Sequence, residues 1–174
     1  MDSVYKFYKN PEFENTLYLD KDGVLNIALL RLGKLSSPRN VDEIKVKKDL
    51  NVIADFSKKK NFNLVIISNQ PDLSRNLINQ SFLDLNIDMI REYLPISVAL
   101  ICPHLSSANC SCRKPKTGLI RNFRDLFPHN HQKELYIGDQ MSDQKCSEEL
   151  GISFIMVHDS FSLNNKIDAT LGNY

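Results

Sequence analysis

The sequence predicts an α/β fold in which helices cover both faces of a mainly parallel β-sheet. Short apolar runs alternate along the chain with segments whose apolar residues recur at helical spacing, the order expected for parallel strands joined through helices. Polar residues follow four of the apolar runs directly, as they do where the carboxyl ends of parallel strands form one edge of a sheet. We therefore expect a Rossmann-like, three-layer sandwich with its functional residues along that edge.

The elements can be assigned in chain order from these patterns. The first clear strand is the apolar run over residues 17–19, which stops at Asp20. Residues 28–40 are rich in Arg, Lys, Ser and Pro and are expected to form an irregular loop over the site. Further strands are predicted over residues 64–67, 98–101, 135–137 and 154–157, and helices over residues 46–60, 83–94, 116–127 and 142–150.

Length and composition indicate one ordinary globular domain. The 174 residues carry a net charge of +1, so no strong field would attract nucleic acid or an anionic membrane. The polar N-terminus lacks the apolar core of a signal peptide, and no apolar stretch approaches the length of a membrane span. No repeat, flexible linker or insertion long enough for a separate cap domain interrupts the pattern. We expect a single cytoplasmic domain over residues 1–174, monomeric, with no nucleic-acid or membrane partner.

Residues 20–23 (DKDG) place two acids and a glycine at the end of the first strand. A calcium loop is a poor alternative, because its first and last ligand positions would fall on Tyr18 and Leu29. A hairpin with its turn at Asp22 and Gly23 would need an alternating partner strand, and residues 27–30 form an unbroken apolar block instead. The hairpin is the weaker reading but stays open. The pattern favours phosphate or metal chemistry.

A second cluster of functional residues lies in the segment after residue 101. Cys102, His104, Cys110 and Cys112 supply three thiolates and an imidazole, the ligand set of a closed tetrahedral zinc site. The alternative is a set of independent buried thiols, but so polar a loop offers them no core. Four protein ligands leave no position for water, so the expected zinc is structural. Cys146, alone in a short helix, is expected to be a small buried hydrophobe.

Four motifs in order resemble those of the haloacid dehalogenase superfamily: LDKDG, IISNQ, RKP and IGDQMSD. The strings CPH and CSCRKP are similar to its zinc-loop branch, which contains the D-glycero-D-manno-heptose 1,7-bisphosphate phosphatases and the histidinol-phosphate phosphatases. The resemblance covers roughly residues 17–157. It implies hydrolysis of a phosphate monoester through a phosphorylated enzyme.

The chemistry assigns a role to each polar strand end. Asp20 would attack phosphorus and become an aspartyl phosphate, while Asp22 would protonate the leaving oxygen and later accept a proton from water. Ser68 can hydrogen-bond the transferring phosphate, and Lys114 can neutralise its growing charge. These four are the predicted catalytic residues.

Two carboxylates and a phosphate repel one another, so a hard cation is expected beside them. Mg²⁺ would be held by Asp20, by Asp139, by the backbone carbonyl of Asp22 and, as a further candidate, by Asp143. The predicted substrate-binding residues are Asn69, Arg75 and Arg113, of which either arginine could bind a second phosphate.

The choice of substrate depends on smaller similarities. Asn26, Arg75 and Gly118 resemble the heptose bisphosphatases, whereas the short zinc loop and the string LICPHL resemble the histidinol-phosphate enzymes. Thr117 and Gln140 depart from the patterns usual in these enzymes. The sequence thus predicts a Mg²⁺-dependent phosphatase for a small phosphorylated metabolite, with D-glycero-D-manno-heptose 1,7-bisphosphate, hydrolysed at position 7, as the first choice. Histidinol phosphate is the alternative substrate, and a nucleic-acid 3′-phosphatase or a non-catalytic, zinc-stabilised binding module are further alternatives.

Overall fold

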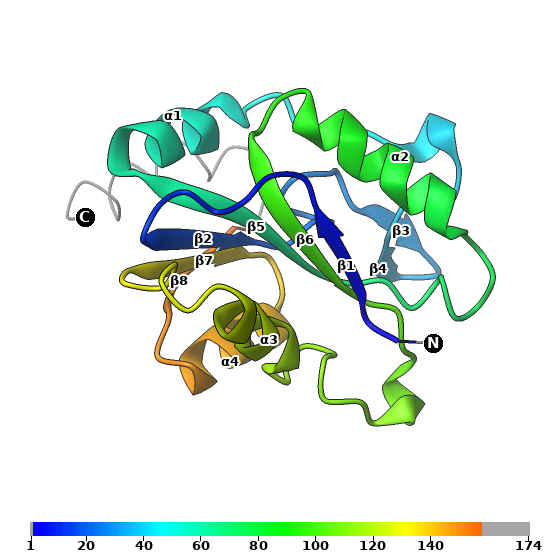
Figure 1. Cartoon of the computed structure of the whole chain (residues 1–174). Helices are drawn as coiled ribbons and strands as arrows, with labels where there is room; N and C mark the ends of the chain where they lie inside the picture. Colours follow the sequence, from blue (N-terminus) through cyan, green and yellow to red (C-terminus); the bar gives the residue numbers. More distant parts are fainter. Residues whose placement is uncertain (1, 158–174) are drawn as a thin grey trace.

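A computed structural model describes residues 2–157 and has a six-stranded sheet between two helical layers (Figure 1). Helices α1 (Asn51–Lys60) and α2 (Gln80–Arg91) cover one face, and α3 (Gly118–Leu126) and α4 (Met141–Glu149) cover the other. The predicted three-layer α/β architecture is confirmed. In sheet order the strands are β1 (Val4–Phe7), β6 (Ile96–Cys102), β5 (Phe62–Asn69), β2 (Asn15–Leu19), β7 (Glu134–Gly138) and β8 (Ser153–Met156).

Strand β2 lies inside the sheet and pairs in parallel with β5 on one side and β7 on the other. All neighbouring strands are parallel except β1, which runs antiparallel to β6 at one edge. The inner strands carry apolar side chains on both faces, because helices bury both faces from water. This arrangement brings the carboxyl ends of β2, β5, β6 and β7 to one edge of the sheet, as the sequence predicted.

Two predictions about the first sixty residues are wrong. Residues 28–40 are not wholly irregular, since β3 (Leu29–Arg31) and β4 (Lys34–Ser36) form a hairpin. Its turn lies at Leu32 and Gly33, both with positive φ (48° and 75°), as a type I′ turn requires. Strand β2, which precedes Asp22 and Gly23, pairs in parallel with β5 on one side and β7 on the other, so the hairpin with its turn at these two residues is ruled out. The helix expected from residue 46 begins only at Asn51.

Helix ends follow ordinary capping rules where the loops meet the sheet. Asn79 caps α2 by accepting a hydrogen bond from the backbone N–H of Phe82 at 2.9 Å. Helix α1 ends at Asn61 in the left-handed conformation, after three lysines that complement the helix dipole.

Within residues 2–157, no helix has the length and apolar character that crossing a membrane requires. The short turns Val41–Glu43 (η1) and Ser106–Ala108 (η2) complete the described elements.

Candidate active site

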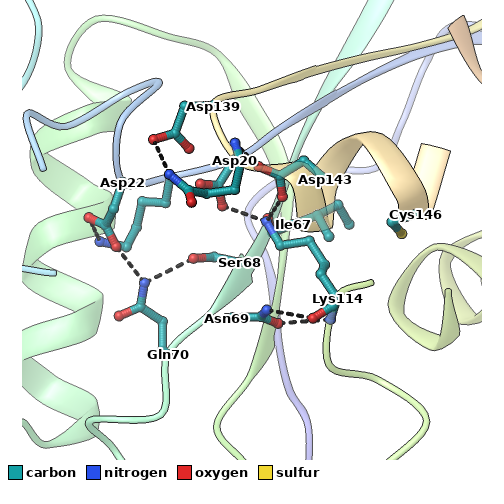
Figure 2. A network of polar contacts seen from close by, with 12 residues as sticks. Asp20, Asp22, Ile67, Ser68, Asn69, Gln70, Lys114, Asp139, Asp143 and Cys146 are labelled. Carbon is teal, nitrogen blue, oxygen red and sulfur yellow. Dashed lines mark hydrogen bonds and ion pairs between the residues drawn. The ribbon is translucent and has the colours of Figure 1, made fainter. Parts of the chain in front are cut away.

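Three carboxylates and one ammonium meet at the carboxyl edge of the sheet (Figure 2). Asp20 follows β2, Asp139 follows β7, and Asp143 lies in the first turn of α4; one oxygen from each lies within 4.8 Å of the other two. Nζ of Lys114 lies 2.6 Å from Oδ1 of Asp20 and 2.6 Å from Oδ1 of Asp143. It also donates to the backbone carbonyl of Ile67 at 2.8 Å. The structure thus gathers predicted residues from three separate motifs.

Burial sets the electrostatics of this cluster. Burial, countered by Lys114 and reinforced by the charges of Asp143 and Asp139, raises the pKa of Asp20 to about 8. Burial alone would lower the pKa of Lys114, but Asp143 and Asp20 outweigh it and hold that pKa well above its usual value. Lys114 therefore stays charged, and the three acids share the positive charge of its ammonium.

Two glycines make room for the acids. Gly23 has a φ of +98°, and a Cβ there would lie 2.0 Å from Oδ2 of Asp139. A Cβ on Gly138 would lie 2.5 Å from Cβ of Asp143. The carboxylates occupy space that any other residue at these two positions would fill.

Asp22 belongs to a separate hydrogen-bond network. Its carboxylate accepts from Lys21 Nζ at 2.6 Å, from the hydroxyl of Ser37 at 2.6 Å and from the amide of Gln70 at 2.7 Å. Burial alone would raise the pKa of Asp22, but Lys21 together with the bonds from Ser37 and Gln70 lowers it below its usual value. Gln70 also donates to Ser68 Oγ at 2.9 Å, which links Ser68 to Asp22.

Asn69 holds the backbone of Lys114 through two hydrogen bonds. Its amide nitrogen donates to the carbonyl of Lys114 at 3.1 Å, and its amide oxygen accepts from the N–H of Lys114 at 3.0 Å. The side chain therefore ties the end of β5 to the loop that carries Lys114. Asn69 also lines the cleft above the acids, and its contact with a substrate stays a prediction.

The cleft over these residues has a volume of about 290 Å³ and includes both predicted arginines in its wall. Arg75 donates to Asp72 at 2.8 Å, and Arg39 donates to the other oxygen of Asp72, also at 2.8 Å. Arg113 donates one N–H to the backbone carbonyl of His104 at 3.0 Å. Arg39 and Arg75 thus share one carboxylate, whereas the Arg113 guanidinium donates to a neutral carbonyl.

The acids fit a hard divalent cation. Oδ1 of Asp139 is buried without a hydrogen-bond partner, and its other oxygen accepts only from Gln140 among the described contacts, at 3.0 Å. An unpaired buried carboxylate oxygen is costly unless a cation completes it. Asp143 lies with Asp20 and Asp139, whereas the Asp22 carboxylate is held by its own network. The side chains therefore favour Asp20, Asp139 and Asp143, and a ligand role for the Asp22 backbone stays a prediction.

The four predicted zinc ligands lie together. Their sulfur pairs are 3.7 Å (Cys102 and Cys110) and 3.4 Å (Cys110 and Cys112) apart, and Nδ1 of His104 lies 3.5 Å from Cys102 and 3.2 Å from Cys112. Around a tetrahedral zinc, neighbouring sulfurs lie about 3.8 Å apart and a sulfur and a nitrogen about 3.6 Å. The donor set and its spacing therefore fit zinc.

The loop that carries the cysteines is tied to the start of α3, on the far side of Lys114 in the chain. The N–H of Gly118 donates to the carbonyl of Ser111 at 3.1 Å, and a Cβ on Gly118 would lie 2.5 Å from that same oxygen. Helix α3 can therefore begin directly beside the cysteines. Since Lys114 lies between these two anchor points in the chain, the position of its backbone depends on the folded loop.

Sequence reasoning missed several residues that shape the site. Lys21 lies between two acids, a position that gives no sign of burial, yet its side chain is enclosed and also donates to Asn86 at 2.9 Å. Ser37 gave no signal because its segment was expected to be irregular. Tyr136 lies inside an apolar strand and read only as core. Gln70 does follow a strand end, the one available signal among these residues.

Known proteins are similar to this chain over most of its length. A family profile described as polynucleotide kinase 3 phosphatase matches residues 34–169. The histidine biosynthesis bifunctional protein HisB of Actinobacillus pleuropneumoniae serotype 3 (strain JL03) is 30% identical over 150 residues, covering 82% of this chain and 40% of the relative. The D-glycero-alpha-D-manno-heptose-1,7-bisphosphate 7-phosphatase of Campylobacter jejuni is 29% identical over 146 residues, covering 81% of this chain and 80% of the relative. The chain thus spans less than half of the HisB relative but most of the heptose enzyme.

Solved structures support the fold. The D,D-heptose 1,7-bisphosphate phosphatase of B. bronchiseptica, complexed with magnesium and phosphate, aligns with a TM-score of 0.67 and 22% identity over 88% of this chain and 86% of that one. The corresponding enzyme of Burkholderia thailandensis aligns with a TM-score of 0.55 and 15% identity over 87% of this chain and 97% of that one. The family match covers most of the chain, and with the gathered motif residues it shows that this chain is a phosphatase of the polynucleotide kinase 3 phosphatase family, within the haloacid dehalogenase-like phosphatases.

Proposed function

We propose that this phosphatase is a Mg²⁺-dependent phosphomonoesterase that acts through an aspartyl phosphate, with a sugar bisphosphate of the heptose 1,7-bisphosphate type as its substrate. The observation that carries the reaction is the buried cluster of Asp20, Lys114 and Asp143 at the floor of the cleft. A nucleophilic carboxylate beside a charged lysine suits attack on phosphorus, because the lysine offsets the repulsion between two anions.

Asp20 must first lose the proton that its raised pKa of about 8 favours, and a divalent cation bound beside it would promote this loss by stabilising the carboxylate. In the first step, a carboxylate oxygen of Asp20 then bonds to phosphorus while the bond to the leaving alcohol breaks. Asp22 gives its proton to that alcohol oxygen. In the second step, water attacks phosphorus, Asp22 takes up the proton, and the bond to Asp20 breaks to release inorganic phosphate. In the free protein the lowered pKa of Asp22 keeps it ionised, so its proton must be taken up as the anionic phosphate arrives and raises that pKa.

The remaining residues of the site would bind the phosphate and hold the metal ions. Ser68 and Lys114 would hydrogen-bond the equatorial phosphate oxygens as charge develops on them. Asp20, Asp139 and Asp143 would hold Mg²⁺, which when bound neutralises the phosphate and the carboxylates around it. The cysteines and His104 would hold a structural zinc that keeps the Lys114 loop in place.

The two arginines in the wall of the cleft, Arg75 and Arg113, support a substrate with a second anionic group. Arg113 uses one of its five N–H groups on His104, which leaves others for a distal phosphate. The similarity to a relative named for heptose 1,7-bisphosphate over most of both chains favours that class. The HisB relative supports histidinol phosphate, and the family match supports a polynucleotide 3′-phosphate as a second candidate.

A phosphate-release assay with equal concentrations of heptose 1,7-bisphosphate, histidinol phosphate and a 3′-phosphorylated oligonucleotide tests the proposal. We expect the highest kcat/KM with the bisphosphate, and no release by an Asp20→Asn control, since an amide is a poor nucleophile. Faster release from the oligonucleotide would replace the proposed substrate. Release by Asp20→Asn at the wild-type rate would refute the aspartyl-phosphate mechanism.

The role of Arg113 can be separated from that of the reacting phosphate. Arg113→Lys should lower kcat/KM for the bisphosphate more than for its monophosphate analogue, because only the bisphosphate presents a distal group to the planar guanidinium. An equal loss with both substrates would assign Arg113 to the reacting phosphate instead.

A further inference from the structure

Tyr136 places a buried hydroxyl beside the side-chain ammonium of Lys114. The residue lies in β7 and is fully buried within the core on the α3 side of the sheet. Its hydroxyl lies 3.2 Å from Nζ of Lys114 and 3.3 Å from Oδ1 of Asp143. A phenol can donate one hydrogen bond and accept others, so this hydroxyl can donate to the carboxylate and accept from the ammonium at once.

The other acceptors of the ammonium explain why this contact matters. Among the residues that the structure describes, four atoms lie within hydrogen-bond distance of Nζ of Lys114: Oδ1 of Asp20, Oδ1 of Asp143, the carbonyl oxygen of Ile67 and the hydroxyl oxygen of Tyr136. The two carboxylates are the groups that the reaction changes. In the proposed reaction Asp20 becomes an acyl phosphate, and both acids are candidate ligands of a divalent cation. Only the carbonyl and the phenol stay the same throughout.

We propose that Tyr136 is a positioning residue that keeps the Lys114 ammonium directed at the reacting phosphate while the charges of Asp20 and Asp143 are engaged elsewhere. This inference rests on the proposed function, because it assigns a part in that reaction. The hydroxyl does not line the cleft, so it acts on the substrate only through Lys114 and Asp143.

The neighbouring strand offers a matched control. Tyr18 in β2 pairs in register with Tyr136, is equally buried, and its ring centroid lies 6.2 Å from that of Tyr136. Its hydroxyl donates to Oε1 of Glu134 at 2.6 Å, and among the described residues it bonds to Glu134 rather than to the acids of the cluster. Tyr18→Phe therefore removes the same kind of bond, from a buried phenol to a carboxylate, without altering the contacts of Lys114.

Steady-state kinetics with p-nitrophenyl phosphate give the first comparison. We expect Tyr136→Phe to lower kcat about tenfold, the size expected for one hydrogen bond to a charged group, while KM changes less than about twofold. Tyr18→Phe should keep kcat within about twofold of the wild type, while it lowers Tm by about as much as Tyr136→Phe does. Equal losses of kcat in both variants would mean that Tyr136 acts only through stability, and would overturn the proposal.

A second readout does not depend on turnover. Lysine labelled with ¹⁵N gives an ammonium NMR signal for Lys114, assigned by its loss in Lys114→Arg. In metal-free protein, Tyr136→Phe should speed hydrogen exchange of that ammonium with water at least fivefold, and Tyr18→Phe should not. Unchanged exchange in Tyr136→Phe would refute the positioning role. A wild-type protein that releases no phosphate from any substrate would instead refute the proposed function.

Discussion

The substitution Gly138→Ala tests whether Asp143 must lie where the structure has it. The added Cβ would lie 2.5 Å from Cβ of Asp143 and 2.7 Å from its Oδ2, whereas ordinary contacts begin at 3.4 Å. Asp143 would have to retreat by about 1 Å, which would stretch its 2.6 Å ion pair with Lys114 beyond hydrogen-bond range. A displacement of about 1 Å in a positioned group can cost roughly 10²-fold in rate.

Backbone strain does not complicate this substitution, because the glycines with positive φ are Gly23, Gly33 and Gly151 among the residues described. We expect Gly138→Ala to lower kcat about 10²-fold, with a stability loss of about 1–3 kcal/mol from overpacking. Phosphate release and urea denaturation measure the two effects.

Gly151→Ala is the control for stability alone. Its φ is +68°, and a Cβ there meets nothing within 4 Å, so alanine should cost about 1 kcal/mol of backbone strain without moving the site. Its kcat should match that of the wild type. A folded Gly138→Ala enzyme with kcat within about twofold of the wild type would show that the reaction does not depend on the position of Asp143.

Two further predictions concern stability. We expect about one zinc per chain, which Cys110→Ser, or chelation of the wild type, should remove. Loss of the zinc should lower the unfolding free energy by several kcal/mol and reduce kcat, because the loop that carries Lys114 is loosened. A metal-free protein with unchanged Tm and activity would contradict this. Asp72→Asn should destabilise the protein by about 1 kcal/mol at neutral pH, since Asp72 pairs with the partly exposed Arg39 and Arg75. Burial would raise the pKa of Asp72, but the bonds from Arg39 and Arg75 lower it. The difference between variant and wild type should therefore hold above about pH 4 and vanish as the pH falls through the lowered pKa, and a difference that persists at pH 2 would refute the pairing.

Much of the fold could be predicted because the inner strands are buried on both faces and read as apolar runs. Strand β1 was missed because it lies at an edge, where half-buried positions accept Tyr5 and Lys6 and leave no apolar run. The β3–β4 hairpin was missed because Leu32 occupies a positive-φ position that glycine or asparagine usually marks. Propensity alone does not indicate such a turn.

The residues of the site also differ in whether the sequence could predict their place. That Asp20 and Asp139 lie together was predictable because chain order places them after parallel strands, and that the four candidate zinc ligands lie together because their spacing is short. The surroundings of Asp22 were not predictable, since Ser37 and Gln70 reach it across the tertiary structure. Neither the lowered pKa of Asp22 nor the contact of Tyr136 with Lys114 has a signature in local sequence.

The central place of β2 has a consequence for synthesis on the ribosome. Strand β2 is made early and finds its first partner in β5, but its other edge stays open until β7 has emerged from the exit tunnel. At elongation rates of about 5–20 residues per second, this wait lasts several seconds. During that time an apolar strand with unpaired backbone groups is exposed, the kind of edge that recruits other chains. A nascent chain stalled before residue 134 would therefore be a target for chaperones that bind exposed strands, and the same chain released early would be prone to aggregate.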